Sequence, residues 1–168
     1  MGKEIERKWI ILPTDEVKNI LITYGGFEIK DYYFNQYCRL RYVDGVWMIT
    51  IKGEGTLERD EYEFRIDKSE INFLPTPNLV KKRIIYPYKN HDFELNVFRD
   101  IPFLDKTNNK LSNLILGEVE LSSPDEEIDI PPFFEQEVTD MKEFYGYNLF
   151  TGYVEYSKNN HIVWNEKE

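Results

Sequence analysis

The chain has 168 residues, of which 41% are hydrophobic and 31% charged, a composition typical of one globular domain and unlike that of a disordered segment. Its formal net charge of −10 argues against electrostatic binding to a nucleic acid polymer or to an anionic membrane. The single cysteine, Cys38, and the lack of an apolar run of roughly 18 residues exclude an internal disulfide and a membrane-spanning helix, and they favour a cytoplasmic location.

The first half of the chain alternates between strand patterns and turns. Residues 3–12 have the period of a strand, and Thr14 then provides an N-cap for an amphipathic helix that the glycine pair 25–26 ends. Strands are predicted next at 27–34, 37–43, 46–52 and 59–66. The turn at 44–45 joins the second and third of these as a hairpin.

The second half is less regular. A proline-containing connector over 67–79, with room for a helical turn, leads to strands at 80–88 and 91–98, a polar linker at 99–113 and a last strand at 114–121. Residues 123–127 have the chemistry of a helix start, with the proline pair 131–132 as its end. Apolar residues at helical spacing over 138–149 predict a further helix, and residues 153–168 carry no clear pattern.

Eight strands with little room for parallel crossovers predict an antiparallel meander. Closing that meander removes its edges. We therefore predict an α+β fold that is mainly β: a closed or nearly closed eight-stranded antiparallel barrel with a charged interior and flanking helices. The whole chain, 1–168, is expected to form one domain, with a core at about 3–150 and a C-terminal extension at 151–168.

The strands carry charged side chains at a spacing of two residues. Since residues i, i+2 and i+4 of a strand point to one side, Glu4, Glu6 and Lys8 project together. Extending the phase of each strand gives an inward set of seven bases and seven acids: Lys8, Arg39, Arg41, Lys52, Arg59, Lys81, Arg83, Glu4, Glu6, Glu61, Glu63, Glu94, Glu118 and Glu120. The apolar side chains fall on the opposite faces, so the barrel is predicted to have a charged interior and an apolar outer wall.

A solvated sheet face with ion pairs between strands is the simpler interpretation of any one of these pairs. The whole face, however, is almost entirely charged, and its neighbouring like charges cost free energy unless a ligand or metal compensates them. Clustered Glu oxygens without His or Cys suit Mg²⁺ or Mn²⁺, and clustered Arg and Lys suit phosphate. A face with both suits a metal–polyphosphate complex.

These residues resemble the CYTH superfamily, the triphosphate tunnel metalloenzymes. The run Glu4-x-Glu6-x-Lys8 is similar to the family's signature motif. The resemblance extends over about residues 3–150 through Arg39-x-Arg41, Thr50-Ile51-Lys52, Arg59-x-Glu61-x-Glu63, Lys81-x-Arg83, Glu94-Leu95-Asn96 and Glu118-Val119-Glu120. It implies an eight-stranded antiparallel tunnel that binds a triphosphate together with Mg²⁺ or Mn²⁺.

The resemblance also implies roles for individual residues. Phosphate-binding roles fall to Lys8, Arg39, Arg41, Lys52, Lys81 and Arg83, to which we add Arg59 from the same face. Metal-binding roles fall to Glu4, Glu6, Glu61, Glu63, Glu118 and Glu120, with Glu94 as a further candidate. Lys8 and Tyr33 are the catalytic candidates, although Tyr33 equally suits a core aromatic position. A base at Lys8 needs a depressed pKa, and we expect its cationic neighbours to lower it.

The main functional prediction is metal-dependent hydrolysis of inorganic tripolyphosphate to diphosphate and phosphate. A nucleoside or thiamine triphosphatase, and an enzyme resembling class IV adenylyl cyclases, are alternatives. A non-catalytic polyphosphate- or nucleotide-binding module is a third reading, suggested by Asn96, because the family usually has Asp there. The expected partner is a small-molecule triphosphate, not a nucleic acid or a membrane. Family members are often dimers, so the resemblance leaves a homodimer open.

Overall fold

A computed structural model describes residues 2–72, 74–157 and 161–168. Its strands are β1 (Gly2–Ile11), β2 (Phe27–Asn35), β3 (Cys38–Val43), β4 (Val46–Lys52), β5 (Glu58–Ile66), β6 (Leu79–Tyr88), β7 (His91–Leu104), β8 (Lys110–Glu120), β9 (Phe134–Glu137), β10 (Gly152–Tyr156) and β11 (Ile162–Glu166). The α-helices are α1 (Asp15–Tyr24) and α2 (Gly146–Leu149), and two single-turn 3₁₀ helices are η1 (Lys68–Glu70) and η2 (Lys142–Phe144).

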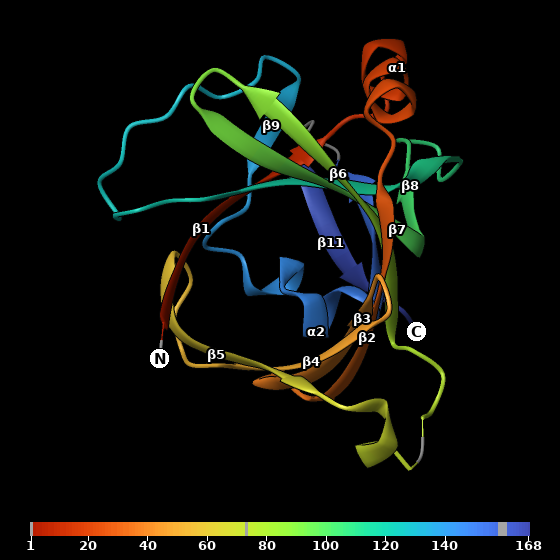
Figure 1. Ribbon diagram of the computed structural model, residues 1–168. Coiled ribbons are helices and arrows are strands. Elements are labelled where there is room, and N and C mark those ends of the chain that lie inside the picture. The colour runs from red at the N-terminus through yellow and green to blue at the C-terminus, as the bar shows by residue number, and fades with distance from the viewer. Residues whose placement is uncertain (1, 73, 158–160) are drawn as a thin grey trace.

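Eight strands close into a barrel. Their order around the wall is β7, β6, β2, β3, β4, β5, β1 and β8, and the β7–β8 pairing completes the circle. Every pair in this circle is antiparallel. Figure 1 shows the strands as a ring, with α1 outside it and α2 across its opening. The eight-stranded antiparallel barrel predicted from the sequence is confirmed.

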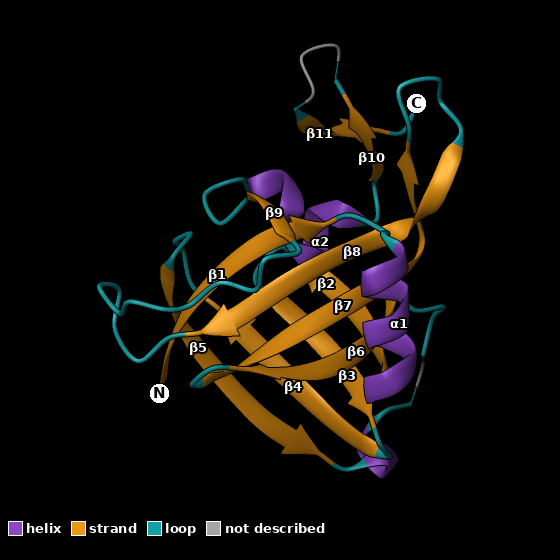
Figure 2. Ribbon diagram, turned by 90° about the horizontal axis from the view of Figure 1, so that it is seen from above, coloured by secondary structure: helices purple, strands orange, loops and turns teal. Residues whose placement is uncertain are grey.

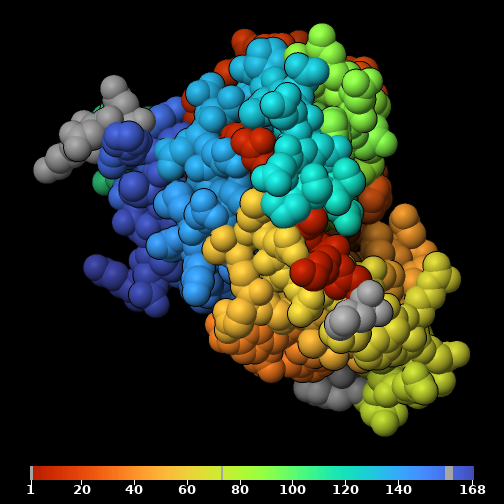
Figure 3. Space-filling view, turned by 90° about the vertical axis from the view of Figure 1, so that its left-hand side faces the viewer, coloured from red at the N-terminus to blue at the C-terminus, as the bar shows by residue number. Residues whose placement is uncertain are grey.

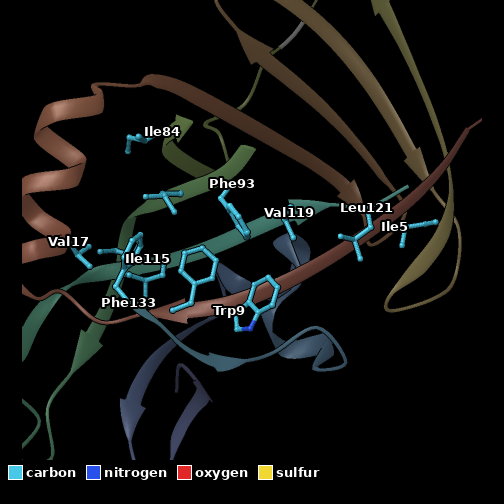
Figure 4. Close-up of a cluster of buried hydrophobic side chains, with 12 residues drawn as sticks. Ile5, Trp9, Val17, Ile84, Phe93, Ile115, Val119, Leu121 and Phe133 are labelled. Atoms are coloured by element: carbon cyan, nitrogen blue, oxygen red, sulfur yellow. The ribbon is translucent and has the colours of Figure 1, made fainter. Parts of the chain in front are cut away.

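One part of the outer wall is covered by α1 and by the chain around β9. The helix begins where the hydroxyl of Thr14 accepts a hydrogen bond from the Val17 amide, at 3.3 Å, and it ends at Gly25, whose φ of 69° favours glycine. Val17 packs into a cluster of buried residues that also contains Trp9 and Phe93. Figure 4 shows this cluster on the outer side of the strands. The apolar faces of the strands therefore form the core outside the barrel.

A second cluster covers the end of the barrel near the C-terminal segment. It joins Ile10 and Leu116 of the wall to Leu149 and Val154 of the chain that follows. The predicted extension 151–168 contains β10 and β11, and β10 joins the sheet through a parallel pairing with β7. Residues 158–160 of that extension lie outside the described residues. Among the described residues, no helix has the length and apolar content needed to cross a membrane.

The prediction of a polar linker at 99–113 is wrong. Strand β7 continues to Leu104 and β8 begins at Lys110, so most of this segment forms a long hairpin. The alternating residues Ile101 and Phe103 are buried in the second cluster, which stabilises the extension. Asp105 then holds the turn, because its carboxylate accepts hydrogen bonds from the amides of Thr107 and Asn109.

The two predicted C-terminal helices are wrong as well. Residues 123–130 form turns and extended chain, where Glu126 accepts a hydrogen bond from the Ser122 amide at 2.8 Å. The helical residues within 138–149 form only the single turns η2 and α2. Tyr145 separates the two turns, and α2 begins at Gly146. Strand β9, which pairs with β1, was not predicted. The connector 67–79 holds the expected helical turn, η1.

Candidate active site

All fourteen residues that the strand phase placed inward line one cavity of about 370 Å³. Four of them, Lys8, Arg41, Lys81 and Glu118, are only 6–8% exposed. Buried charges are costly unless they are paired or bind a ligand. The interior of the barrel is therefore charged, as predicted.

The closure of the barrel brings three carboxylates together. Glu6 on β1, Glu94 on β7 and Glu118 on β8 each have an oxygen within 4.8 Å of the others. The pairing register explains this, because Glu118 lies opposite Lys8 on one side and opposite Glu94 on the other. Three carboxylates in one place suit a hard divalent cation.

The electrostatics of this group are dominated by burial and crowding. Burial, and then the charge of Glu118, raise the pKa of Glu6 to about 7. Burial opposes ionisation of Glu118 too, but the ammonium groups of Lys8 and Lys81 lower its pKa to about 2. The Lys8 Nζ atom lies 3.8 Å from a Glu6 oxygen and 3.5 Å from a Glu118 oxygen. Glu6 is thus the carboxyl that a cation could deprotonate near neutral pH.

The same contacts overturn the expectation of a depressed pKa at Lys8. Burial does lower it, but the two nearby carboxylates outweigh burial and raise the Lys8 pKa above its usual value. Lys8 also donates a hydrogen bond to the Phe144 carbonyl at 3.3 Å. The contacts of Lys8 therefore favour its ammonium form, which argues against a role as a base.

The remaining acidic candidates line the cavity outside the three-carboxylate group. Glu4 contacts Lys52 at 2.7 Å and Arg59 at 2.8 Å, and these cations lower its pKa despite its burial. Glu61 lies 3.2 Å from Lys52. The other two are Glu63 and Glu120. Glu63 accepts a hydrogen bond from Thr50, and the pKa of Glu120 is raised by burial and by the charge of Glu4.

Asp31, which contacts the cavity-lining residue Arg41, was not predicted to take part. Asp31 is fully buried, and its two oxygens accept hydrogen bonds from Arg41 at 2.7 and 2.8 Å. Burial raises the pKa of Asp31, but the positive charges of Arg41 and Arg39 outweigh this effect and lower the pKa below its usual value. The signal was present in the sequence, because Asp31 is two residues before Tyr33 and so shares its face.

Two of the seven basic residues that the strand phase placed inward, Arg39 and Lys81, have no carboxylate within 4.0 Å among the described residues. The Nε atom of Arg39 is buried without a hydrogen-bond partner. Burial and the charges of Arg83 and Arg41 lower the pKa of Lys81 well below its usual value. Cations that no carboxylate contacts directly suit a polyanionic ligand.

Asn96 lies opposite Arg83 in a fully buried position. Its side-chain oxygen accepts a hydrogen bond from Arg83 at 2.9 Å, while its side-chain nitrogen has no partner among the described residues. Arg83 also forms an ion pair with Glu94 at 3.1 Å. A neutral amide at this position leaves more of the Arg83 charge available to a ligand than a carboxylate would.

The segment 142–150 lies across one end of the cavity and contributes several of its lining residues. The Tyr145 hydroxyl donates a hydrogen bond to the Gly55 carbonyl at 2.9 Å, and its ring lies 5.1 Å from the Arg59 guanidinium carbon. Nothing in the local sequence predicted this placement, which depends on how the chain returns to the barrel.

Tyr33 lines the cavity, as expected of a site residue, and it also packs as an aromatic. Its hydroxyl is 3.5 Å from Arg39, and its ring contacts those of Tyr147 and Phe150. Among the described residues, no hydrogen bond joins Tyr33 to Lys8. The two catalytic candidates therefore share the cavity without forming a direct pair.

Comparison with known proteins identifies relatives along most of the chain. An inorganic triphosphatase of Nitrosomonas europaea is 32% identical over 150 residues, which cover 84% of this chain and 92% of the relative. The crystal structure of the inorganic triphosphatase NE1496 is similar with a TM-score of 0.54 and 28% identity, covering 89% of this chain and 95% of that one. A crystal structure of the hypothetical protein NE1496 gives a TM-score of 0.53 and 29% identity, covering 87% and 96%. No family model matches the sequence.

Proposed function

This chain belongs to the CYTH superfamily, the triphosphate tunnel metalloenzymes, and on that premise we propose that it hydrolyses inorganic tripolyphosphate to diphosphate and phosphate. The observation that carries the proposal is the cavity, which combines three clustered carboxylates with two cations, Arg39 and Lys81, that have no carboxylate within 4.0 Å among the described residues. Such a lining complements a triphosphate that arrives with a divalent metal. A relative named inorganic triphosphatase, 32% identical, supports this substrate.

The carboxylate group fits a divalent cation. Glu6, Glu94 and Glu118 would hold Mg²⁺ or Mn²⁺, since they offer only oxygen and include one carboxyl with a pKa raised by burial. When bound, the ion would neutralise charge that develops on the phosphate oxygens. The other acidic candidates, Glu4, Glu61, Glu63 and Glu120, stay predictions as further metal ligands or as partners that tune the cations.

The basic residues would hold and orient the triphosphate. Arg39 and Lys81 form no ion pair within 4.0 Å among the described residues, so they can bind an anion without breaking one. Lys8, as a permanent ammonium beside the carboxylates, would stabilise negative charge on the substrate without taking up a proton. The remaining candidates are Arg41, Lys52, Arg59 and Arg83, which already have polar partners in the wall.

Positioning and charge neutralisation are the main requirements of phosphoryl transfer. The segment 142–150 helps to separate the cavity from bulk water, which strengthens both effects. Hydrolysis needs only a water molecule as co-reactant: it adds to the terminal phosphorus as the bond to the departing diphosphate breaks. Tyr33, which contacts Arg39 at the cavity wall, would orient the group that Arg39 binds.

The test is phosphate release from tripolyphosphate, ATP and thiamine triphosphate, each with Mg²⁺ and with Mn²⁺. We expect tripolyphosphate to be cleaved fastest and Glu118→Gln to lower kcat/KM roughly a hundredfold or more, about 3 kcal/mol of transition-state stabilisation. The matched control is Glu127→Gln, an exposed residue outside the cavity. Binding of all three compounds without phosphate release would instead indicate a binding module. Faster cleavage of ATP or thiamine triphosphate would indicate that one of these, and not tripolyphosphate, is the substrate.

We also propose that the protein is located in the cytoplasm. A single cysteine suits the reducing cytoplasm, and a small triphosphate is the partner that the cavity volume accommodates. Fractionation of cells that express the chain would check this location.

A further inference from the structure

Strand β1 changes its neighbour near Lys8. From Gly2 to Ile5 it pairs with β5, and the Glu6 amide then donates a hydrogen bond to the Leu57 carbonyl at 2.9 Å. Beyond Glu6 the neighbour on this side is the returning segment 137–139. Figure 2 shows β9, which leads into this segment, lying beside β1. The wall of the barrel at Lys8 is therefore completed by a part of the chain that is far away in sequence.

Both backbone groups of Lys8 are bound by this segment. The Val138 amide donates a hydrogen bond to the Lys8 carbonyl at 2.8 Å. The Lys8 amide donates to the Thr139 hydroxyl at 3.0 Å, so a side chain supplies the acceptor that a backbone carbonyl supplies in a regular ladder. Thr139 is only 8% exposed, and a buried amide without an acceptor is costly. The hydroxyl of Thr139 thus stabilises the backbone at Lys8.

The other neighbour of β1 does not bind the backbone of Lys8. Backbone groups in an antiparallel strand face the two neighbours alternately. The Ile5 carbonyl accepts a hydrogen bond from the Leu121 amide at 2.7 Å, so Ile5 faces the β8 side. Lys8 is three residues further on and faces the opposite side, although its side chain lies opposite Glu118. Thr139 and Val138 are therefore its backbone partners.

A chain of polar contacts fixes the orientation of the Thr139 hydroxyl. Thr139 donates a hydrogen bond to the Glu137 carboxylate at 2.8 Å, and Arg7 binds the same carboxylate at 2.7 and 2.9 Å. A hydroxyl has one proton, so its use toward Glu137 leaves the lone pairs of the oxygen to accept from Lys8. Arg7 in turn lies over the Trp9 ring, with its guanidinium carbon 4.7 Å from the ring centre. These contacts hold Thr139 in place from the outer side of β1.

The ammonium end of Lys8 contacts the same returning chain. Its Nζ atom donates a hydrogen bond to the Phe144 carbonyl at 3.3 Å. The hydroxyl of Thr56 donates to Asp140 at 2.8 Å, which ties this part of the chain to the loop before β5. In Figure 3 light-blue residues of the returning chain lie against gold residues of that loop. Lys8 is thus held at its backbone and at its ammonium group by one stretch of chain.

We propose that Thr139 is a positioning residue for Lys8: by binding the Lys8 amide, it fixes the point at which the Lys8 side chain enters the cavity. This inference rests on the proposed function, in which the ammonium group stabilises negative charge on a bound triphosphate. Such stabilisation depends on distance and on prior orientation, so a small shift of the ammonium group weakens it. Thr139 is not among the residues that line the cavity, so it acts through Lys8.

The first experiment follows the position of Lys8 in protein without ligand, by the NMR signal of its ε-carbon. Thr139→Val keeps the shape of the side chain and removes the hydroxyl, so we expect this signal to shift. Thr139→Ser restores a hydroxyl and should restore the signal. Thr56→Val is the matched control, because it removes a hydroxyl that binds Asp140 of the same stretch of chain. It should leave the Lys8 signal in place.

The second experiment measures kcat and KM for tripolyphosphate under conditions in which urea unfolding shows each variant to be folded. We expect Thr139→Val to lower kcat about tenfold, the effect of one lost hydrogen bond. Thr139→Ser should recover most of this loss, and Thr56→Val should keep kcat close to that of the wild type.

Two results would overturn the proposal: an unshifted Lys8 signal in Thr139→Val, or an equal loss of kcat in Thr139→Val and Thr56→Val. If the wild-type chain releases no phosphate, the proposed function fails. The NMR comparison still decides in that case whether Thr139 positions Lys8, because it needs neither substrate nor turnover.

Discussion

Asp31 and the cavity-lining residue Arg41 form a buried ion pair, at 2.7 and 2.8 Å. Replacing a buried pair as a whole costs little, but removing one partner leaves an uncompensated charge. Here that charge would stand near Arg39 and Lys81, which have no carboxylate within 4.0 Å in the part of the chain that the structure describes. Asp31 is therefore the residue that allows so many cations to share this side of the cavity.

We expect Asp31→Asn to lower the free energy of unfolding by about 3 kcal/mol, because Arg41 loses its counter-charge. For a chain of this length that corresponds to a loss of roughly 6–12 °C in Tm. Tripolyphosphate should raise the Tm of this variant more than that of the wild type, since the anion replaces the missing charge. Differential scanning calorimetry with and without tripolyphosphate measures both effects.

The control is Asp60→Asn, which removes an exposed carboxylate of β5. Surface substitutions of this kind change stability by about 0.5 kcal/mol or less. If the Asp31 and Asp60 variants unfold at the same temperature, the buried pair does not have the role assigned to it.

At the scale of elements, the segment 142–150 matters more than its two single helical turns suggest. It is held against the barrel by the Tyr145 hydroxyl, and Gly146 lies directly against the ring of Tyr33. A Cβ atom at Gly146 would fall 2.0 Å from the Tyr33 hydroxyl oxygen. The close approach of the segment to the cavity therefore requires glycine at this position.

Gly146→Ala should force the segment or the Tyr33 ring to move. We expect a loss of about 1–3 kcal/mol of stability from overpacking, together with a lower kcat/KM for triphosphate hydrolysis. Gly53→Ala is the matched control, because its Cβ would sit at an ordinary 3.5 Å from the nearest atom, in Asp60. Urea unfolding and phosphate release measure the two effects. Equal behaviour of the two variants would contradict a close fit at Gly146.

At the scale of the whole molecule, the barrel has a charged interior and an apolar exterior. Its apolar core forms three clusters among the described residues, which lie around Trp9, around Leu116 and around Trp47. The cost of burying charge inside is offset by ion pairs around the cavity, and the least compensated acid is Glu6. The stability of the whole fold is thus linked to proton and metal binding at the site.

The raised pKa of Glu6 sets the direction in which pH changes the stability of the fold. The Glu6 pKa is raised from 4.5 to about 7, so the folded metal-free protein holds a proton that the unfolded chain has released over this range. Its contribution to stability is present below pH 4.5 and is lost as the pH rises through about 7. A divalent cation binds the ionised form, so its stabilising effect should grow over the same range.

We therefore expect a subsaturating concentration of Mg²⁺ to raise Tm more at pH 8 than at pH 6. One pH unit below the Glu6 pKa, the apparent affinity falls about tenfold, or about 1.4 kcal/mol. Thermal shift measurements at both pH values test this. Glu6→Gln should abolish the pH dependence of the Mg²⁺ effect, and an equal Mg²⁺ shift at both pH values in the wild type would refute the assignment.

The sequence by itself determined the strands and the face on which their charges lie. Alternation with a period of two is local, so Glu4, Glu6 and Lys8 could be placed inside before any contact was known. The same local reasoning failed at 99–113 and at 123–149, where burial against distant strands decided the structure.

Only the tertiary structure decided which charges meet. The convergence of Glu6, Glu94 and Glu118 depends on the closure of β1, β8 and β7 into a barrel. The raised pKa of Lys8 follows from the same convergence, because Coulomb interactions depend on distances between strands far apart in sequence. The position of Tyr145 across the cavity likewise depends on the path of the returning chain. A strand pattern specifies the face of each side chain, but register and closure specify its neighbours.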